Sequence, residues 1–289
     1  MEEAARKAQT LVEALPYILN FRNKFTVVKF GGSIVREPRL ARLILEDLVF
    51  MSAVGMKVVL VHGGGPRISE ALEEKRLKSH FREGLRYTNA ETIAVIRETL
   101  ASLNQELISR LEEIGGRARS VLPEDRALGA VKFNLPDADL GLVGEIKEVN
   151  AEFFDDIGRQ GVIPVIVPLA FGADGLLYNI NADSAASKIA VGLSAEKLVF
   201  LTDKPGIMRD PADPESLISI LRPSQARTLI EDKIITSGML PKVNAGLSAM
   251  ESGLRKVHLI GGQLPHALLL EIFTTQGVGT EIVPEDYDE

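Results

Sequence analysis

Two short apolar runs end in consecutive glycines, and they constrain the fold more than any other feature of the chain. TVVKFGGS begins at Thr26 and VVLVHGGGP begins at Val58. Such β-branched runs are typical of buried parallel strands, and glycines after a strand let the backbone approach an anion at the start of a helix. Lys29 adds a positive charge beside these amides. The two turns together predict a phosphate cradle, although a single glycine turn is also common where no phosphate binds.

Neither turn matches an established phosphate-binding motif. The chain contains no G-x-x-x-x-G-K-[ST] sequence, and the glycines at 63–65 do not extend to G-x-G-x-x-G. Any phosphate chemistry must therefore use another arrangement.

Composition excludes several classes of protein. At 289 residues and 45% apolar content, the chain is long enough for one large or two modest domains. Its net charge of −7 argues against a nucleic-acid partner, and its lack of cysteine excludes disulfides, thiolate catalysis and cysteine-ligated metals. No apolar run approaches the ~20 residues needed to span a bilayer. We expect a cytoplasmic protein that binds neither nucleic acid nor membrane.

Predicted strands and helices alternate from Thr26 onward. The strands are 26–30, 57–61, 117–122, 162–167, 197–201 and 256–260, and the helices are 38–54, 66–76, 90–114, 151–160, 183–193, 223–232, 241–253 and 265–275. This alternation predicts a three-layer α/β sandwich with a mostly parallel central sheet. Residues 123–149 break the pattern and predict a hairpin excursion, which could form a substrate wall or only a surface hairpin.

Residues 1–23 carry the apolar spacing of an amphipathic helix, with Pro16 expected to kink it. The pattern leaves open whether this helix packs on its own domain or on another subunit. We expect three units, at residues 1–24, 25–178 and 179–289. The turn at 171–175 is the best candidate for the segment where one lobe ends and the next begins.

A further cluster of polar residues begins at Tyr178, where YNINADS precedes a predicted helix. Asn179, Asn181 and Asp183 stand at alternating positions, and an ordinary helix N-cap would explain one of them. Alternation along an extended segment points all three to the same side. We therefore expect these amide and carboxylate groups to hold a polar ligand.

Two more motifs lie in the second half of the chain. LTDKPGI ends a predicted strand in Thr202 and Asp203, which is ordinary turn chemistry and also a usual place for nucleotide contacts in a parallel sheet. TSGMLPKV places Gly238 and Lys242 around a helix start. A lysine in a first turn opposes the helix dipole, so it indicates a nearby anion.

Together these motifs resemble the amino acid kinase family, and within it the acetylglutamate kinases. The resemblance covers nearly the whole chain: ALPYI at Ala14, VKFGGS, VHGGGP, GLRYT at Gly84, DLGLVGEI at Asp139, YNINADS, AEKLVFLTD at Ala195, SGMLPK and HALLLEIFT at His266. It implies the two-lobed amino acid kinase fold and ATP-dependent phosphorylation of the γ-carboxylate of N-acetyl-L-glutamate, the second step of arginine biosynthesis. It also implies Mg²⁺ held by the nucleotide, with no metal site made by the protein.

The resemblance also implies a role for each matching residue. Phosphoryl transfer depends on positioning and on positive charge at the transferring oxygens. The family's motifs assign this charge to Lys29 and Lys242, from opposite lobes, with Asp183 holding both lysines. The residues expected to bind the substrate are Gly64, Gly65, Arg86, Asn179 and Asn181, and those expected at the phosphates and ATP are Gly31, Gly32, Ser33, Thr202, Asp203 and Gly238.

Regulation by arginine is a further implication of the resemblance. Family members that arginine inhibits carry an extra N-terminal helix, which interlaces dimers into a homo-hexamer. By this comparison the arginine site is bordered by Tyr17, Lys197, His258, Glu271 and Gly277. Glu271 has the charge that a guanidinium needs, whereas His258 alone would more often be a core histidine.

The chain departs from the family pattern at four positions. Ser33 stands where Asn is usual, Asn89 and Gly261 where Asp is usual, and Ser237 where a second glycine is usual. Two alternatives stay open: a kinase for another acidic amino acid such as aminoadipate, and a catalytically silent regulatory subunit that binds arginine.

Overall fold

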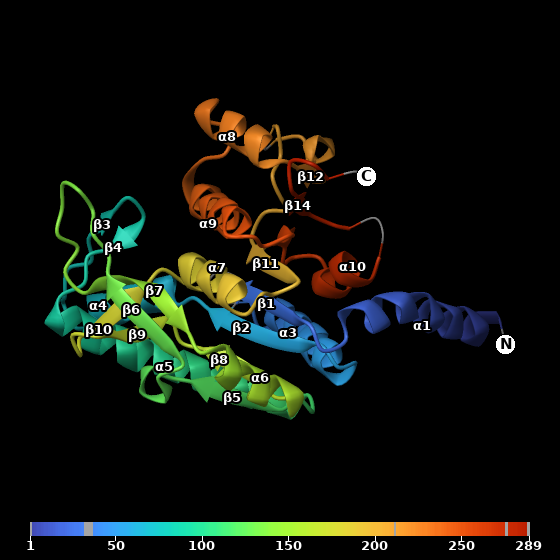
Figure 1. Cartoon of the computed structure of the whole chain (residues 1–289), viewed down its shortest axis with the longest axis horizontal. Coiled ribbons are helices and arrows are strands. Elements are labelled where there is room, and N and C mark those ends of the chain that lie inside the picture. Colours follow the sequence, from blue (N-terminus) through green and yellow to red (C-terminus); the bar gives the residue numbers. More distant parts are fainter. Residues whose placement is uncertain (1, 32–36, 211, 275–276, 288–289) are drawn as a thin grey trace.

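A large, mostly parallel sheet forms the centre of the protein, in a computed structural model that describes residues 2–31, 37–210, 212–274 and 277–287 (Figure 1). In spatial order its strands are β12 (Ile220–Leu221), β14 (Thr280–Ile282), β13 (Val257–Gly261), β11 (Lys197–Thr202), β1 (Phe25–Phe30), β2 (Lys57–His62), β8 (Ile163–Ile166) and β5 (Ala118–Val121). Neighbouring strands are parallel except for β13 and β14.

Helices cover both faces of this sheet because alternate residues of each strand point to opposite sides. On β1, Val27 belongs to one apolar core and Val28 to another. The first core contains residues of α6 (Ala151–Arg159), α7 (Ala182–Gly192), α8 (Pro223–Glu231) and α9 (Leu240–Glu251), and the second contains residues of α3 (Pro38–Ala53), α5 (Ala90–Glu113) and α10 (Ala267–Phe273). The predicted three-layer sandwich is confirmed.

A small second sheet lies beside helices α5 and α7. Its strands are β6 (Leu128–Lys132), β7 (Val143–Val149), β9 (Leu169–Gly172) and β10 (Leu177–Ile180), and they close on themselves in the order β10, β7, β6, β9. The antiparallel pair of β6 and β7 confirms the predicted hairpin. The turn at 171–175 joins β9 to β10 inside this sheet, so the chain leaves the sheet only after Ile180. The domain boundaries that we expected stay a prediction.

All six predicted strands and all eight predicted helices are present, with ends that differ by a few residues. The remaining helix of the core region is α4 (Gly65–Glu74), and β3 (Phe81–Arg82) and β4 (Leu85–Arg86) form a separate hairpin. Short 3-10 turns lie at Pro123–Asp125, Pro214–Ser216 and Ser237–Met239. Sequence reasoning missed β9, β10, β12 and β14 because runs of two to four residues carry too little pattern.

The N-terminal helix α1 (Glu2–Phe21) extends away from the rest of the chain (Figure 1). Phe21 is buried, whereas Leu11, Leu15 and Leu19 are exposed. The helix contains Pro16, as expected, and the kink itself stays a prediction. No helix in the described part of the chain combines the length and the apolar character that crossing a membrane requires.

The order of the strands brings three predicted motifs together. The strands β11, β1 and β2 are neighbours and parallel, so their carboxyl ends, at Thr202, Phe30 and His62, lie along one edge of the sheet. The segments that follow these strands therefore meet at this edge, as expected for a ligand site in an open parallel sheet.

We predict that Phe154→Ala lowers the free energy of unfolding by about 3–5 kcal/mol, because the ring is fully buried in the first core and its loss leaves a cavity. Phe81→Ala is the matched control, since that ring is 59% exposed and should cost about 1 kcal/mol or less. Urea denaturation of both variants measures the difference. Equal losses in the two variants would contradict this account of the core.

Candidate active site

The Asp183 carboxylate lies between two lysines from different parts of the fold. Lys29 Nζ is 2.9 Å from Asp183 Oδ1, in a buried ion pair. Lys242 Nζ donates to Asp183 Oδ2 at 3.3 Å. The structure therefore brings together the three residues that the sequence predicted as the centre of the chemistry.

Local structure explains why these side chains converge. Asn181 caps helix α7 by accepting the backbone N–H groups of Asp183 and Ser184, at 2.9 and 3.1 Å. Asp183 thereby occupies the first turn, where the helix dipole favours a negative charge. Lys242 occupies the first turn of α9, where the dipole disfavours a positive charge. The Asp183 carboxylate compensates for that position.

Burial and charge act against each other at this centre. Burial by itself would raise the pKa of Asp183, but the charges of Lys29 and Lys242 outweigh burial and hold the pKa below its ordinary value. Burial lowers the pKa of Lys29, and the Asp183 carboxylate offsets only part of that effect. Two ammonium groups and one carboxylate leave one positive charge in excess, so the centre is suited to a further anion.

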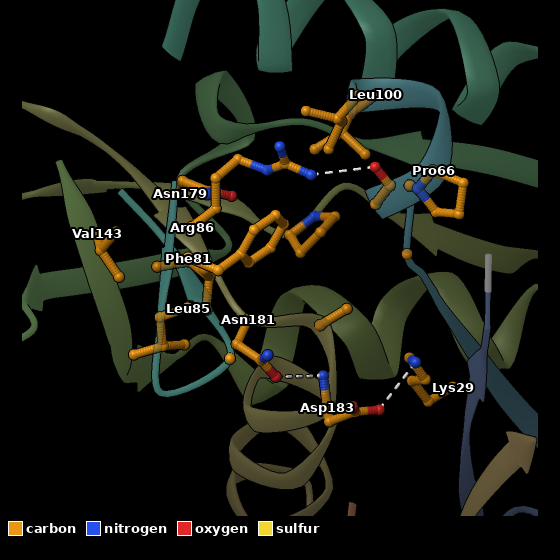
Figure 2. Close-up of a pocket in the computed structure, with 18 residues that line it drawn as sticks. Lys29, Pro66, Phe81, Leu85, Arg86, Leu100, Val143, Asn179, Asn181 and Asp183 are labelled. Carbon is orange, nitrogen blue, oxygen red and sulfur yellow. Dashed lines mark hydrogen bonds and ion pairs between the residues drawn. The ribbon is translucent and has the colours of Figure 1, made fainter. Parts of the chain in front are cut away.

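A cavity of about 280 Å³ opens beside Lys29 and Asp183. Figure 2 shows Arg86 at one end of this cavity and the ion pair of Lys29 and Asp183 at the other. The turn at 63–65 forms part of the wall between them. A Cβ added at Gly65 would meet nothing within 4 Å, so a ligand could approach this backbone directly. Both predicted turn residues, Gly64 and Gly65, line the cavity.

Arg86 is held in place by several neighbours. It donates to the Gly65 carbonyl at 3.1 Å, to Ser69 Oγ at 3.0 Å and to the Ser79 hydroxyl. Its guanidinium carbon also lies 4.5 Å from the centre of the Phe81 ring. Burial lowers the pKa of Arg86, yet a guanidinium stays charged in proteins. The guanidinium has five N–H groups and three are donated to these acceptors, so two are left for a ligand carboxylate.

The two predicted asparagines also line this cavity, but in different ways. Asn179 donates to Thr88 Oγ1 at 3.1 Å, and Thr88 Oγ1 donates to the Arg86 carbonyl at 2.8 Å. The oxygen of Asn181 is occupied by the N-cap of α7, so its amide N–H groups are the part available to a ligand. Sequence reasoning missed Ser69, Ser79, Phe81 and Thr88, because no sequence pattern connects them with Arg86 or Asn179.

A second cavity, of about 370 Å³, is lined in part by Lys242. Three of its residues, Thr202, Asp203 and Gly238, were predicted at the nucleotide, and Lys242 was predicted as a catalytic group. The rest of the lining was not predicted and is largely apolar, and it consists of Lys204, Gly206, Ile207, Met208, Ile234, Ile235, Thr236 and Met239. An apolar cavity with a few polar groups at its edge is suited to a planar ring bearing phosphates.

Of the glycine turn after β1, only the first residue can be described. A Cβ added at Gly31 would lie 3.2 Å from the Leu201 carbonyl and 3.9 Å from Lys29 Nζ, so a side chain here would crowd the lysine. The predicted phosphate-binding residues Gly32 and Ser33 lie outside the described residues.

The residues predicted to bind arginine lie at a separate place, near the end of α1. His258 Nδ1 is 2.6 Å from Glu271 Oε1, and Lys197 Nζ is 3.1 Å from His258 Nε2. Gly277 has φ 59°, and its Cβ would lie 3.2 Å from Glu271 Oε2. Tyr17 packs against the core that Phe21 enters. Burial lowers the pKa of His258. The cluster therefore exists, and its assignment to arginine stays a prediction.

Known proteins are similar to this chain over nearly its full length, including both cavities. The acetylglutamate kinase of Halothermothrix orenii is 44% identical over 289 residues, covering 99% of this chain and 100% of that protein. Among solved structures, N-acetylglutamate synthase from Neisseria gonorrhoeae, complexed with coenzyme A and N-acetyl-glutamate, has a TM-score of 0.86 and 26% identity over 97% of this chain. This chain spans 64% of that synthase. The same synthase with coenzyme A and L-arginine has a TM-score of 0.81 and 26% identity, over 96% of this chain and 65% of that one.

The sequence profile of the amino acid kinase family matches residues 24–261, which contain both cavities and the charged centre between them. A shared fold alone would not produce a family match of this length or a relative with 44% sequence identity over 99% of the chain. The chain therefore belongs to the amino acid kinase family.

Proposed function

We propose that this protein transfers the γ-phosphoryl group of ATP to the γ-carboxylate of N-acetyl-L-glutamate. The observation that carries the proposal is the Asp183 carboxylate shared by Lys29 and Lys242, between a cavity that ends in a buried arginine and a cavity with an apolar lining. The curated relative with 44% identity, named acetylglutamate kinase, supports the same conclusion.

The first cavity is suited to a dicarboxylate. Its two ends carry positive charge, from Arg86 at one end and from Lys29 at the other (Figure 2). A substrate that places its α-carboxylate on the Arg86 fork would direct its γ-carboxylate toward Lys29. Asn179 and Asn181 would then hold the N-acetyl amide between the two ends.

The reaction requires little proton transfer. An ionised carboxylate attacks the γ-phosphorus directly, a new P–O bond forms, and the bond to the bridging oxygen of ADP breaks. No general base is needed, which agrees with an Asp183 carboxylate whose pKa lies below its ordinary value. The role of Asp183 would be to hold Lys29 and Lys242 where charge develops on the transferring oxygens.

ATP would occupy the second cavity, with Thr202, Asp203 and Gly238 near its polar parts. We assign the predicted phosphate contact to Gly31, the first residue of the turn after β1. The described residues contain no group of three or more His, Cys, Asp or Glu side chains that could hold a metal ion. We propose that Mg²⁺ arrives bound to the phosphates of ATP and to water, where it would neutralise part of their charge.

The two lobes would divide these tasks. We assign substrate binding and dimerisation to residues 25–178, ATP binding to residues 179–289, and oligomerisation to the helix within residues 1–24. Lys29 would then act from the first lobe and Lys242 from the second, so the chemistry would depend on both.

L-Arginine is the proposed effector, at the cluster of Lys197, His258 and Glu271 near the end of α1. Lys197 Nζ lies 5.1 Å from the centre of the Phe21 ring, so a ligand that displaced this lysine would also act on α1. The exposed leucines of α1 suggest that the helix packs on another copy of the chain. A homo-hexamer built as a trimer of dimers is the assembly that we propose.

We predict rapid ATP consumption with N-acetyl-L-glutamate, slow consumption with aminoadipate, and inhibition by L-arginine. A coupled assay that measures ADP release tests all three. Faster turnover of aminoadipate would favour the other kinase, and arginine binding without turnover of either substrate would favour a silent regulatory subunit. Full activity of a hexameric sample in saturating arginine would contradict the regulatory proposal.

We predict that Lys242→Ala lowers kcat by about 10²–10³-fold, because it removes one of two charges that act on the transferring oxygens. The thermal midpoint should change little, since the Asp183 carboxylate keeps its ion pair with Lys29. Lys75→Ala is the control, because that lysine only pairs with the exposed Glu98. A variant of Lys242 that retained normal kcat would show that the assigned role is wrong.

We predict that Leu15→Glu converts the hexamer into smaller species, because it places a charge on the exposed apolar face of α1. Leu176→Glu is the matched control: Leu176 is 49% exposed, Leu15 is 48% exposed, and Leu176 lies in the turn between β9 and β10. Size-exclusion chromatography with light scattering measures the mass of each. An unchanged mass for Leu15→Glu would argue against oligomerisation through α1.

A further inference from the structure

We infer that His62 is a positioning residue, which fixes the Gly63–Gly64 peptide so that the Gly64 N–H group faces the substrate cavity. This inference rests on the proposed function, because the value of that N–H group lies in binding a substrate or phosphoryl oxygen. His62 is fully buried and does not line the cavity. It would therefore act on the reaction only through the glycine turn.

The hydrogen bonds around His62 determine which ring nitrogen carries the proton. Asn104 Nδ2 donates to the Val165 carbonyl at 2.9 Å and lies 3.1 Å from His62 Nε2. The Asn104 amide nitrogen has two protons and no acceptor capacity, so His62 Nε2 must accept. The single proton of the neutral ring is then on Nδ1, and Nδ1 donates to the Gly63 carbonyl at 3.1 Å.

The ring stays neutral because it is buried. Burial lowers the pKa of His62 to about 4, although its bond to the Gly63 carbonyl acts in the opposite direction. At neutral pH every polar atom of the ring therefore has one defined partner. Neither rotation of the ring nor exchange of the proton between its nitrogens is compatible with these bonds.

The bond to the Gly63 carbonyl sets the direction of the next amide. In a trans peptide the C=O and N–H groups point in opposite directions. The Gly63 carbonyl points toward the buried ring, so the Gly64 N–H group points away from that ring. Because Gly63, Gly64 and Gly65 line the cavity, we infer that this N–H group faces it. Hydrogen bonds among the described residues give the Gly64 N–H group no acceptor.

The other polar group of Gly63 is fixed as well. Its N–H group donates to the Phe30 carbonyl at the end of β1, at 3.0 Å. Gly63 is thus bonded to β1 on one side and to His62 on the other. The turn can bind a ligand without first reorganising, which is the condition under which a backbone amide contributes most to catalysis.

The test compares His62→Asn with His62→Leu. The two new side chains have nearly the same shape, but only asparagine keeps an N–H donor close to the position of Nδ1. Both variants leave the same Asn104 proton without its histidine partner. We expect His62→Asn to retain at least tenfold higher kcat than His62→Leu, with little difference in KM for ATP, because the second cavity is not affected. Leucine is the more favourable residue in an apolar site, so the thermal midpoints should not follow this order.

A role in stability alone predicts the opposite result, with equal activities or with the leucine variant more active, and that result would overturn the inference.

A second measurement uses the unaltered protein. ¹⁵N NMR of protein labelled in its 4 histidines reports the tautomer of His62, assigned by the signal lost in His62→Asn. A proton on Nδ1 supports the inference, and a proton on Nε2 overturns it. If the unaltered protein did not phosphorylate N-acetyl-L-glutamate, the proposed function would fail, while the tautomer would still test the inference.

Discussion

The ion pair of Lys29 with Asp183 is the contact on which the site depends. It buries two charges at 2.9 Å from each other, each group only 6% exposed, and it adds a third charge from Lys242. Buried ion pairs contribute little net stability, because desolvation offsets most of their attraction. A centre of this kind, with an excess positive charge, is better explained by the anion that it is suited to bind than by the stability of the fold.

The fold supplies the three groups from separate elements. Lys29 lies near the carboxyl end of β1, Asp183 in the first turn of α7, and Lys242 in the first turn of α9. Parallel pairing of β1 with β2 and β11 brings the glycine turns and the Thr202 segment to the same edge of the sheet. Asp183 and Lys29 line the first cavity, and Lys242, which donates to Asp183, lines the second, so the charged centre connects the two cavities.

The sequence predicted those parts of the molecule that have strong local patterns. The strand that contains Lys29 is apolar, and the helix after Asn181 is well capped. Their positions could therefore be predicted without knowing what packs against them. The serines that hold Arg86 could not be predicted, because Ser69 and Ser79 come close to it only through the packing of α4 and the β3–β4 hairpin. His62 belongs to the VHGGGP motif, yet only its three-dimensional contact with Asn104 gives it a role.

Two departures from the family pattern have a structural explanation. Asn89 caps α5 by accepting the Thr92 N–H group at 2.8 Å, and aspartate and asparagine are about equally good at this position. At Gly261 an added Cβ would lie only 3.0 Å from Pro205 Cα and 3.1 Å from the Lys204 carbonyl. An aspartate there would push the segment of Lys204 and Gly206, which lines the second cavity, away from β13. The glycine therefore lets this wall of the proposed nucleotide cavity lie closer to the sheet than an aspartate would allow.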